Sequence, residues 1–481
     1  MASVKLIVKT GEAAERFQIL KHSGYLLLAR LFARLASFPF MLYTAVRLGP
    51  PLFGVFAFTL ASVEMLSALG DLGLSRYGAR ELIRQDGRRA SLAGIILTLQ
   101  LLVSVVLTVV AVVILLLLTP GPAKRDVLLL GLAAAFVSSF IFTTDTVFTA
   151  CRRFGASAVF AVIGRVVYLA AGFAALRLGY SVVAVTAAFL LGYLVESALR
   201  MAYTGWRVTP FSFGFRRAEL AVFLRGAAPF ALSAVATLVY FRADTLIMEL
   251  LRGDIDVGIY NAAYSFFAFF VWAPIILART LLPGLTERFR TDPEGAELVN
   301  WFWLRAVGAA SVPVAFAMTM LAGPLIRSLM PPEFNGSIIA LQVLMWSIPP
   351  LMMVTVGFNA LVVTNRERQA AGTTVATALI IVVLDLVLIH YYGVTGAAAA
   401  MVTATALWLI QVHWLLRREV LAPGHGLAGA YGLPLTGGAL MAGAASLAAR
   451  YGIWASLAAG LIVYVAVLAA ARAISDDMQR Q

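Results

Sequence analysis

Long apolar runs separated by short polar connections dominate this chain. Most runs hold about twenty residues or more, the length that crosses the hydrocarbon core of a bilayer as a helix. Strands of a membrane barrel would be about ten residues long and would alternate apolar with polar positions. The pattern predicts an all-α polytopic membrane protein with about fourteen transmembrane helices, at residues 24–46, 52–74, 91–119, 127–150, 156–177, 181–203, 220–250, 256–284, 303–328, 337–363, 369–391, 394–416, 427–449 and 452–473.

The pattern also repeats. The segment 49–58 is echoed by 253–262: each has two glycines five apart, followed by an aliphatic and an aromatic residue that open an apolar helix. Corners at Leu178-Gly179-Tyr180 and Tyr392-Gly393-Val394 each follow an arginine-rich connection and one apolar run. We expect two six-helix bundles that are parallel repeats, a design found in transporters. The expected domains are 1–23 (cytoplasmic segment), 24–203 (first bundle), 204–219 (cytoplasmic linker), 220–416 (second bundle), 427–473 (extra helix pair) and 474–481 (cytoplasmic tail).

Basic residues indicate the orientation of these helices. With the N-terminus inside, 23 Lys and Arg residues fall in cytoplasmic segments and seven in outer connections. Short loops rich in Lys and Arg stay on the cytoplasmic side. We therefore expect a multi-pass protein of the cytoplasmic (inner) membrane with both termini in the cytoplasm. The same distribution accounts for the net charge of +13 without nucleic acid as a partner.

Composition excludes several kinds of chemistry. The chain is 61% hydrophobic and 13% charged, with one cysteine and four scattered histidines, so a metal site is not expected. It has no Gly-x-x-x-x-Gly-Lys-[Ser/Thr] phosphate loop for ATP hydrolysis. No serine or histidine lies in a nucleophile signature. We expect a protein that is not an enzyme and that carries no cofactor.

Arginine is the only basic residue inside the predicted spans, and an arginine near the bilayer centre costs about 2.5–3.5 kcal/mol on insertion scales. Seven arginines are not counted with the connections, and three of them lie close enough to a cytoplasmic end to reach the interface, namely Arg225, Arg279 and Arg305. Arg30 and Arg34 lie deeper, four apart on one helix face, where like charges repel. They fit either two salt bridges or a cationic lining for a phosphate-bearing substrate, which guanidinium groups bind bidentately.

The remaining charges in the spans fit both pairing and function. Arg165 lies near mid-span, and Arg242 lies only two residues from Asp244, so these two side chains do not face each other on a helix. Asp71 and Glu196 lie near cytoplasmic ends, where they are expected to pair with arginines such as Arg76 or Arg200. The other acids are candidates for gating or for coupling to Na⁺ or H⁺: Glu64, Asp145, Asp244 and Asp385.

Several short stretches, taken in order, resemble a known family. The corner at 48–56, followed by Gly-Asp-Leu-Gly-Leu-Ser-Arg at 70–76, resembles the opening of bacterial Wzx-type O-antigen and exopolysaccharide flippases. These belong to the multidrug/oligosaccharidyl-lipid/polysaccharide superfamily. Stretches that resemble later parts of the family lie at 242–247, 257–260, 332–336, 341–344 and 392–398, so the resemblance covers roughly residues 20–420.

The resemblance implies a flippase that moves undecaprenyl-diphosphate-linked oligosaccharide to the outer leaflet by alternating access. It also implies a cationic cavity for the diphosphate-sugar head, with the polyprenyl tail left in the bilayer. Polysaccharide polymerase and glycosyltransferases are the protein partners to expect. The candidate substrate-binding residues are five arginines for the diphosphate and three tyrosines for stacking on sugars: Arg30, Arg34, Arg165, Arg242, Arg279, Tyr43, Tyr240 and Tyr264.

Three alternatives stay open at this point. A drug or organic-cation exporter of the same superfamily needs an acidic cavity, against which the deep arginines count. A non-transporting membrane scaffold for glycosyltransferases does not require buried arginines. A flippase for lipid-linked peptidoglycan precursors is a close relative that composition does not exclude.

Overall fold

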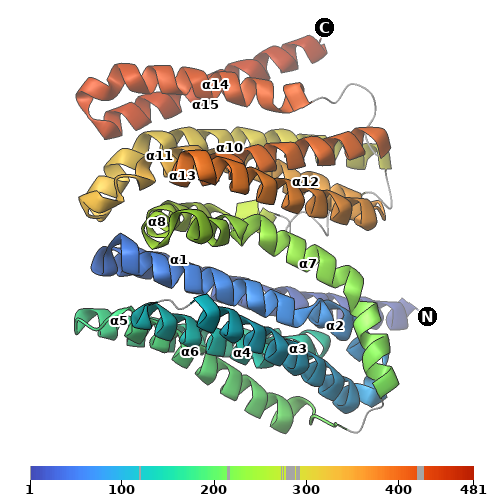
Figure 1. Cartoon of the computed structure of the whole chain (residues 1–481). Helices are drawn as coiled ribbons and strands as arrows, with labels where there is room; N and C mark the ends of the chain where they lie inside the picture. The colour runs from blue at the N-terminus through green and yellow to red at the C-terminus, as the bar shows by residue number, and fades with distance from the viewer. Residues whose placement is uncertain are drawn as a thin grey trace. The chain divides into compact units, whose positions relative to one another are not determined.

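All elements in the described part of the chain are helices. The computed structural model describes residues 2–118, 121–213, 217–271, 273–274, 276–277, 288, 293–419 and 427–480. The main helices, labelled in Figure 1, are α1 (Ala2–Asp71), α2 (Leu74–Arg84), α3 (Arg89–Leu118), α4 (Pro122–Ala150), α5 (Phe154–Arg177), α6 (Val182–Tyr203), α7 (Arg217–Arg252), α8 (Asp254–Phe270), α10 (Pro293–Leu329), α11 (Ser337–Leu344), α12 (Ile348–Val363), α13 (Glu367–Glu419), α14 (Leu427–Ala448) and α15 (Ile453–Arg480).

The apolar runs became membrane-length helices. Within the described residues, nine helical segments are long and apolar enough to cross a membrane. Two of them, Leu35–Arg84 and Glu367–Arg418, have 50 and 52 residues, more than twice the roughly 20 that one crossing needs. Both contain a non-helical glycine, Gly49 or Gly393. The prediction of an all-α polytopic membrane protein is confirmed, whereas the count of fourteen spans stays a prediction.

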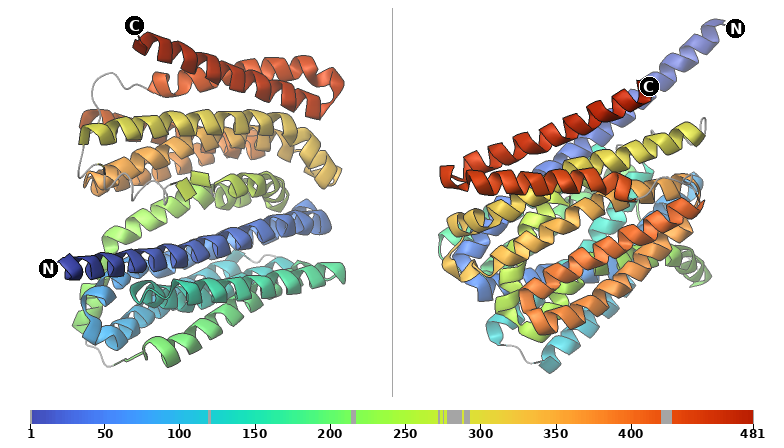
Figure 2. Two further views of the ribbon diagram at one scale, coloured as in Figure 1. Left: turned by 180° about the vertical axis from the view of Figure 1, so that it is seen from behind. Right: turned by 90° about the horizontal axis from the view of Figure 1, so that it is seen from above.

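Contacts along the chain group it into two compact units, Met1–Arg242 and Ala243–Gln481. The colours of Figures 1 and 2 run from blue to green through the first unit and from green to red through the second. The division falls inside α7, so the predicted bundles 24–203 and 220–416 stay a prediction. In the second unit, the predicted extra helix pair packs on α10, where the Tyr464 hydroxyl donates a hydrogen bond to the Ala309 carbonyl at 2.8 Å.

Each unit has a glycine corner where the sequence predicts one. Gly49 has φ 70° and ψ 170°, and Gly253 has φ 82° and ψ −175°. This part of backbone space is essentially closed to residues with a Cβ. The later corners also hold left-handed glycines, with φ 78° at Gly179 and 56° at Gly393. Glycine lets the chain reverse between two apolar helices with almost no loop.

An arginine joins the two corners of each unit. In the first unit, Arg47 donates through Nη2 to the carbonyl of Leu176 at 3.0 Å. In the second, Arg252 donates through Nε to the carbonyl of Ile389 at 3.1 Å. The last carbonyls of a helix lack a donor within that helix, so a nearby arginine satisfies them. The two units thus use the same device to fix one corner against the other.

A third shared device lies where α4 meets α5 and where α12 meets α13. The amide of Arg153 donates to the carbonyl of Phe148, and that of Arg366 to the carbonyl of Leu361, both at 2.8 Å. These are six-to-one bonds that close a helix end around a left-handed residue. That residue is Arg152 (φ 56°) in the first unit and Asn365 (φ 61°) in the second. Asparagine adopts this conformation readily, whereas arginine does so at a cost of about 1–2 kcal/mol.

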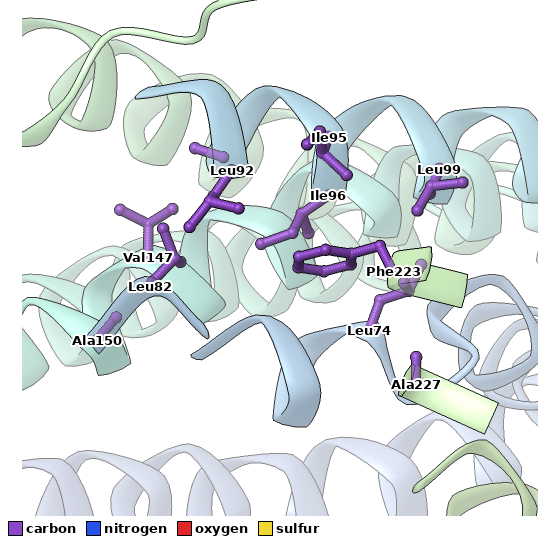
Figure 3. Packing of buried hydrophobic residues seen from close by; sticks show 11 residues of the cluster. Leu74, Leu82, Leu92, Ile95, Ile96, Leu99, Val147, Ala150, Phe223 and Ala227 are labelled. Atoms are coloured by element: carbon purple, nitrogen blue, oxygen red, sulfur yellow. The ribbon is translucent and has the colours of Figure 1, made fainter. Parts of the chain in front are cut away.

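A buried apolar cluster holds the short helix α2 in place. Leu74 and Leu82 of α2 pack with Ile96 of α3, Val147 of α4 and Phe223 of α7, as Figure 3 shows. The other members of the cluster are Leu92, Ala93, Ile95, Leu99, Ala150 and Ala227. Because side chains from four helices interlock here, the ends of α2 and α4 are fixed relative to one another.

We expect Gly253→Ala to destabilise the protein by about 1–3 kcal/mol, the cost of forcing a Cβ into a glycine-only conformation. A Cβ at this position would have no heavy atom within 4 Å, so the cost is conformational rather than steric. Thermal unfolding of the purified protein measures it. The control is Gly372→Ala in α13, also in open space but helical, where a gain of about 0.5–1 kcal/mol is expected. Equal effects at the two positions would contradict the assigned strain.

Candidate functional site

A bidentate ion pair joins α1 to α7 inside the first unit. Arg242 donates from Nε to Oε2 of Glu64 at 2.5 Å and from Nη2 to Oε1 at 3.0 Å. The Arg242 side chain is 14% exposed and that of Glu64 is 43% exposed. The planar guanidinium matches the carboxylate, which is the strongest geometry for such a pair. The ion-pair partner of Arg242 thus lies on another helix, 178 residues away in the chain.

Two further groups extend this polar region. Arg165 of α5 lies 5.8 Å from the ring centre of Tyr168, within cation–π range. The charges of both Arg165 and Glu64 act on the hydroxyl of Tyr193 in α6. Arg165, Tyr193, Glu64 and Arg242 therefore bring side chains of four helices, two of them cationic, into one region of the first unit.

A second network surrounds Arg200, whose side chain is 4% exposed. Its Nε donates to Glu196 at 2.8 Å, and its Nη1 donates to Asp145 at 3.3 Å. The same nitrogen donates to the Ser157 hydroxyl at 3.2 Å, while Nη2 donates to the Ser157 carbonyl at 3.1 Å. The expected Glu196–Arg200 pair is confirmed. Asp145, a predicted coupling residue, is held in this network by Arg200 and by Ser157, which donates to it at 2.6 Å.

Asp71, the other acid expected to pair near a helix end, is bound mainly by neutral groups. The Ser75 amide donates to its Oδ1 at 3.1 Å and the Gln100 amide nitrogen at 2.7 Å. The positive charge of Arg76 also acts on it. The expected neighbour is therefore present, but hydrogen bonds from serine and glutamine hold the carboxyl group.

The second unit contains a buried pair of carboxyl groups. Asp244 of α7 and Asp385 of α13 are both fully buried, and their charges interact directly. The Tyr260 hydroxyl of α8 donates to Asp244, as does the Thr245 amide, the latter at 2.6 Å. Within the described part of the chain, neither oxygen of Asp385 has a hydrogen-bond partner. The sequence singled out both acids as coupling candidates, and the fold brings them together.

The chemistry of this pair favours a small cation. Two carboxylates buried side by side repel each other, and a proton or a monovalent cation between them removes that repulsion. Nearby, the Asn261 side chain donates to the Val257 carbonyl at 3.0 Å. Among the described residues, no group of three or more His, Cys, Asp and Glu could hold a metal ion. Carboxyl groups are hard oxygen ligands, so the arrangement suits H⁺ or Na⁺ better than a metal that prefers imidazole or thiolate.

The three candidate tyrosines pack against other aromatic rings. Tyr43 lies 5.0 Å from Phe173, and Tyr240, which is fully buried, lies 4.8 Å from Phe241. Tyr264 is 6% exposed and lies 5.4 Å from Phe267. In this conformation these rings contribute to packing. Their stacking on sugars stays a prediction.

The other predicted arginines divide into two groups. The side chains of Arg30 and Arg34, which lie on α1, and the whole of Arg279 fall outside what the structure describes. Their role stays a prediction. Arg225 and Arg305 are exposed, and their reach to the membrane interface stays a prediction.

Sequence reasoning missed three groups of this site. Tyr260 lies in the repeated corner motif but was not recognised as the partner of Asp244. Tyr193 gave no signal, since a tyrosine in an apolar helix is ordinary. Arg200 was counted with the basic residues on the cytoplasmic side, although its side chain is among the most buried charges in the described residues. Its position four residues after Glu196 was the available signal, because that spacing places both on one helix face.

The helices and their buried charges define a class: a polytopic membrane protein with arginines and carboxyl groups held inside its spans, as in transporters. The family model described as "Polysaccharide biosynthesis protein" matches residues 19–287, more than half of the chain. The chain belongs to this family. No curated protein matches it in sequence.

Solved structures show the same fold. The structure "Lipid II flippase MurJ, inward closed conformation" aligns with a TM-score of 0.77 at 12% identity, covering 92% of this chain and 97% of that one. An inward-facing multidrug resistance MATE family transporter of the MOP superfamily gives 0.67 at 15% identity, covering 79% and 93%. A MOP superfamily transporter from Pyrococcus furiosus gives 0.57 at 16% identity, covering 82% and 94%. The chain therefore has the fold shared by MurJ and the MATE transporters.

Proposed function

We propose that this protein is a flippase that translocates polyprenyl-diphosphate-linked oligosaccharide from the inner to the outer leaflet of the cytoplasmic membrane for polysaccharide biosynthesis. Family membership supports a role in polysaccharide biosynthesis, and the fold shared with a lipid flippase supports translocation of a lipid-linked substrate. The substrate moves by alternating access around an arginine-lined cavity, and no covalent chemistry occurs, so the protein is not an enzyme.

The observation that carries the proposal is the Glu64–Arg242 pair. Arg242 is held inside the membrane by a carboxylate that is itself 43% exposed. Phosphate oxygens accept hydrogen bonds from a guanidinium in the same bidentate geometry as carboxylate oxygens do. A diphosphate can thus replace Glu64 as the partner of Arg242. When Glu64 binds Arg242 again, the diphosphate is released. Arg165 adds a second cation to the same region.

The test uses liposomes that hold a fluorescent polyprenyl-diphosphate sugar, with the protein or a variant reconstituted into them. Wild type is expected to flip the lipid. Arg242→Gln is expected to slow flipping about tenfold to a hundredfold, since a hydrogen bond to a charged group contributes about 1.5–3 kcal/mol. The double variant Glu64→Gln/Arg242→Gln, in which the pair is neutral, is expected to be as slow while remaining folded.

The matched control is Arg225→Gln, which removes an exposed arginine from the same helix. It should flip at the wild-type rate. If the folded double variant flips as fast as wild type, the pair is structural and the proposed phosphate contact is wrong. If wild type leaves the lipid in place but exports a cationic dye, the protein is a drug exporter of the same fold.

We propose that transport is coupled to Na⁺ or H⁺ through Asp244 and Asp385. Their burial, their direct electrostatic interaction and the unpartnered oxygens of Asp385 support a cation site there. A cation-coupled exporter is the second candidate function that this pair favours, and the likeness to MATE transporters is consistent with it. The arginines of the first unit favour an anionic substrate over a cationic drug.

A peptidoglycan-precursor lipid carries the same diphosphate and is a close substrate alternative, given the likeness to the lipid II flippase. Competition between the two lipids in the liposome assay distinguishes the two substrate proposals, because the lipid that is flipped faster is the preferred substrate. We place both termini in the cytoplasm on the basis of the arginine distribution. Polysaccharide polymerase and glycosyltransferases remain the proposed protein partners.

A further inference from the structure

A pocket lined by arginines lies at the ends of α2 and α4 in the first unit. It has a volume of about 370 Å³, and its lining includes Arg89, Arg152, Arg153 and Arg207 together with Cys151 and Ile83. This volume is within the range of small-molecule sites. None of these residues belongs to the Glu64–Arg242 pair or to the Arg200 network. The pocket is therefore separate from the groups proposed to act on the translocated lipid.

The apolar cluster of Figure 3 gives this pocket a fixed wall. Ala150 belongs to that cluster and also lines the pocket, and Cys151 and Val208 pack against the cluster while lining the pocket. The lining residues come from α2, the start of α3, the α4–α5 corner and the short π-helix Thr204–Val208. A site assembled from four such segments is preorganised by their packing.

The corner that carries Arg152 is strained in a way that its counterpart is not. The two corners share their backbone hydrogen bonds, yet the left-handed position holds arginine in the first unit and asparagine in the second. Glycine or asparagine would fill this position at lower cost. Strained backbone persists where the side chain has a role. Arg152 lines the pocket. It is also the residue for which the left-handed conformation costs more than it does for Asn365 at the equivalent position.

The lining selects an anion. Four of the eight residues that line the pocket are arginines. Guanidinium groups bind phosphate oxygens bidentately. Trp206, next to Arg207, is 81% exposed, and the Arg207 guanidinium lies 4.6 Å from its ring centre. Exposed tryptophan is enriched at the membrane–water interface, at the level of lipid headgroups.

We propose that this pocket binds the phosphate group of an anionic phospholipid headgroup in the leaflet that adjoins the arginine-rich ends of the helices. The chemistry recognised is a phosphate, which soluble phosphate compounds also carry. The position of Trp206 favours the lipid. The bound headgroup ties the ends of α2 and α4, the α4–α5 corner and the π-helix to the membrane surface.

The chain supplies its own reporter, because Cys151 is its single cysteine and lines the pocket. The full-length protein is reconstituted in phosphatidylcholine membranes with or without phosphatidylglycerol, and the rate of alkylation by the uncharged reagent N-ethylmaleimide is measured by mass spectrometry. At about ten times its dissociation constant, the anionic lipid is expected to slow alkylation about tenfold, since the rate falls as one plus that ratio.

Arg152→Asn places in the first unit the residue that the second unit uses, so the corner is expected to fold. Loss of one charge-assisted contact weakens binding about tenfold, and protection of Cys151 then shrinks to about twofold. Arg153→Gln is a second variant that leaves the left-handed residue unchanged. The control is Arg368→Gln, which removes an exposed arginine beside the equivalent corner and should retain full protection.

Equal protection in wild type and in both pocket variants would overturn the proposal, because lipid would then shield Cys151 without the arginines. No protection by phosphatidylglycerol or by inorganic phosphate would also overturn it. Protection by inorganic phosphate alone, in phosphatidylcholine membranes, would support the phosphate site and overturn the lipid assignment. Thermal unfolding in the same membranes is the second readout, with a lipid-dependent rise expected in wild type and a smaller one in Arg152→Asn.

Discussion

Arg200→Ala is expected to destabilise the protein by about 3 kcal/mol, the lower end of the cost of breaking a buried ion pair. The arginine side chain is 4% exposed, while its partners Glu196 and Asp145 are 16% and 39% exposed. Without the guanidinium, two carboxylates and Ser157 lose their shared donor. Partial hydration of Asp145 limits the loss, which is why the lower end applies. Thermal or chemical unfolding of the reconstituted protein measures the change.

Two comparisons make this result specific. Arg200→Lys keeps the charge but supplies one nitrogen where three donated, so it should recover only part of the stability. Arg80→Ala removes an arginine that is 56% exposed and lies 3.7 Å from Glu81, for which less than about 1 kcal/mol is expected. If Arg200→Ala and Arg80→Ala cost the same, the Arg200 network does not hold the ends of α4, α5 and α6 together.

Asp385→Asn is expected to abolish the response of transport to an ion gradient and, at the same time, to make the protein more stable. The substitution removes a buried charge beside Asp244. Within the described residues, the Asp385 oxygens have no hydrogen bond to lose. Asparagine stays polar at this position, so the expected gain in stability comes from the lost charge repulsion with Asp244. Flipping under an imposed Na⁺ or H⁺ gradient and thermal unfolding, measured on one preparation, test the two opposite effects.

The control for this substitution is Asp126→Asn, near the start of α4, where the side chain is 53% exposed. Neither gradient response nor stability should change there. A variant of Asp385 that still responds to both gradients would remove the acid pair from the coupling mechanism. A folded but destabilised Asp385→Asn would show instead that its carboxylate contributes to packing.

Local rules predicted much of this structure. Apolar run length gave the helices, and glycine spacing gave the corners at Gly49 and Gly253. The rule that side chains four apart on a helix share a face joined Glu196 to Arg200. Each of these inferences depends on neighbours in the chain, for which helix geometry is known in advance.

Distant partners could not be predicted in the same way. Glu64 and Arg242 are 178 residues apart, and nothing local selects one acid among several for this arginine. The burial of Arg200 was not predicted, because the rule for basic residues counts charges near helix ends and does not consider packing. Tyr240, a candidate for stacking on sugars, is fully buried in this conformation. The sequence does not distinguish an aromatic residue that lines a cavity from one that packs in a core.

The contact between Tyr260 and Asp244 has a consequence for the order in which the chain is made. A ribosome releases α7 with Asp244 long before α13 with Asp385. An acidic side chain inside the membrane is costly in free energy unless a hydrogen-bond donor contacts it. Tyr260 lies on α8, the next helix synthesised, and the corner at Gly253 turns that helix back. The nascent hairpin thus satisfies its own acid at once, and the repulsive partner Asp385 is added only when α13 is made.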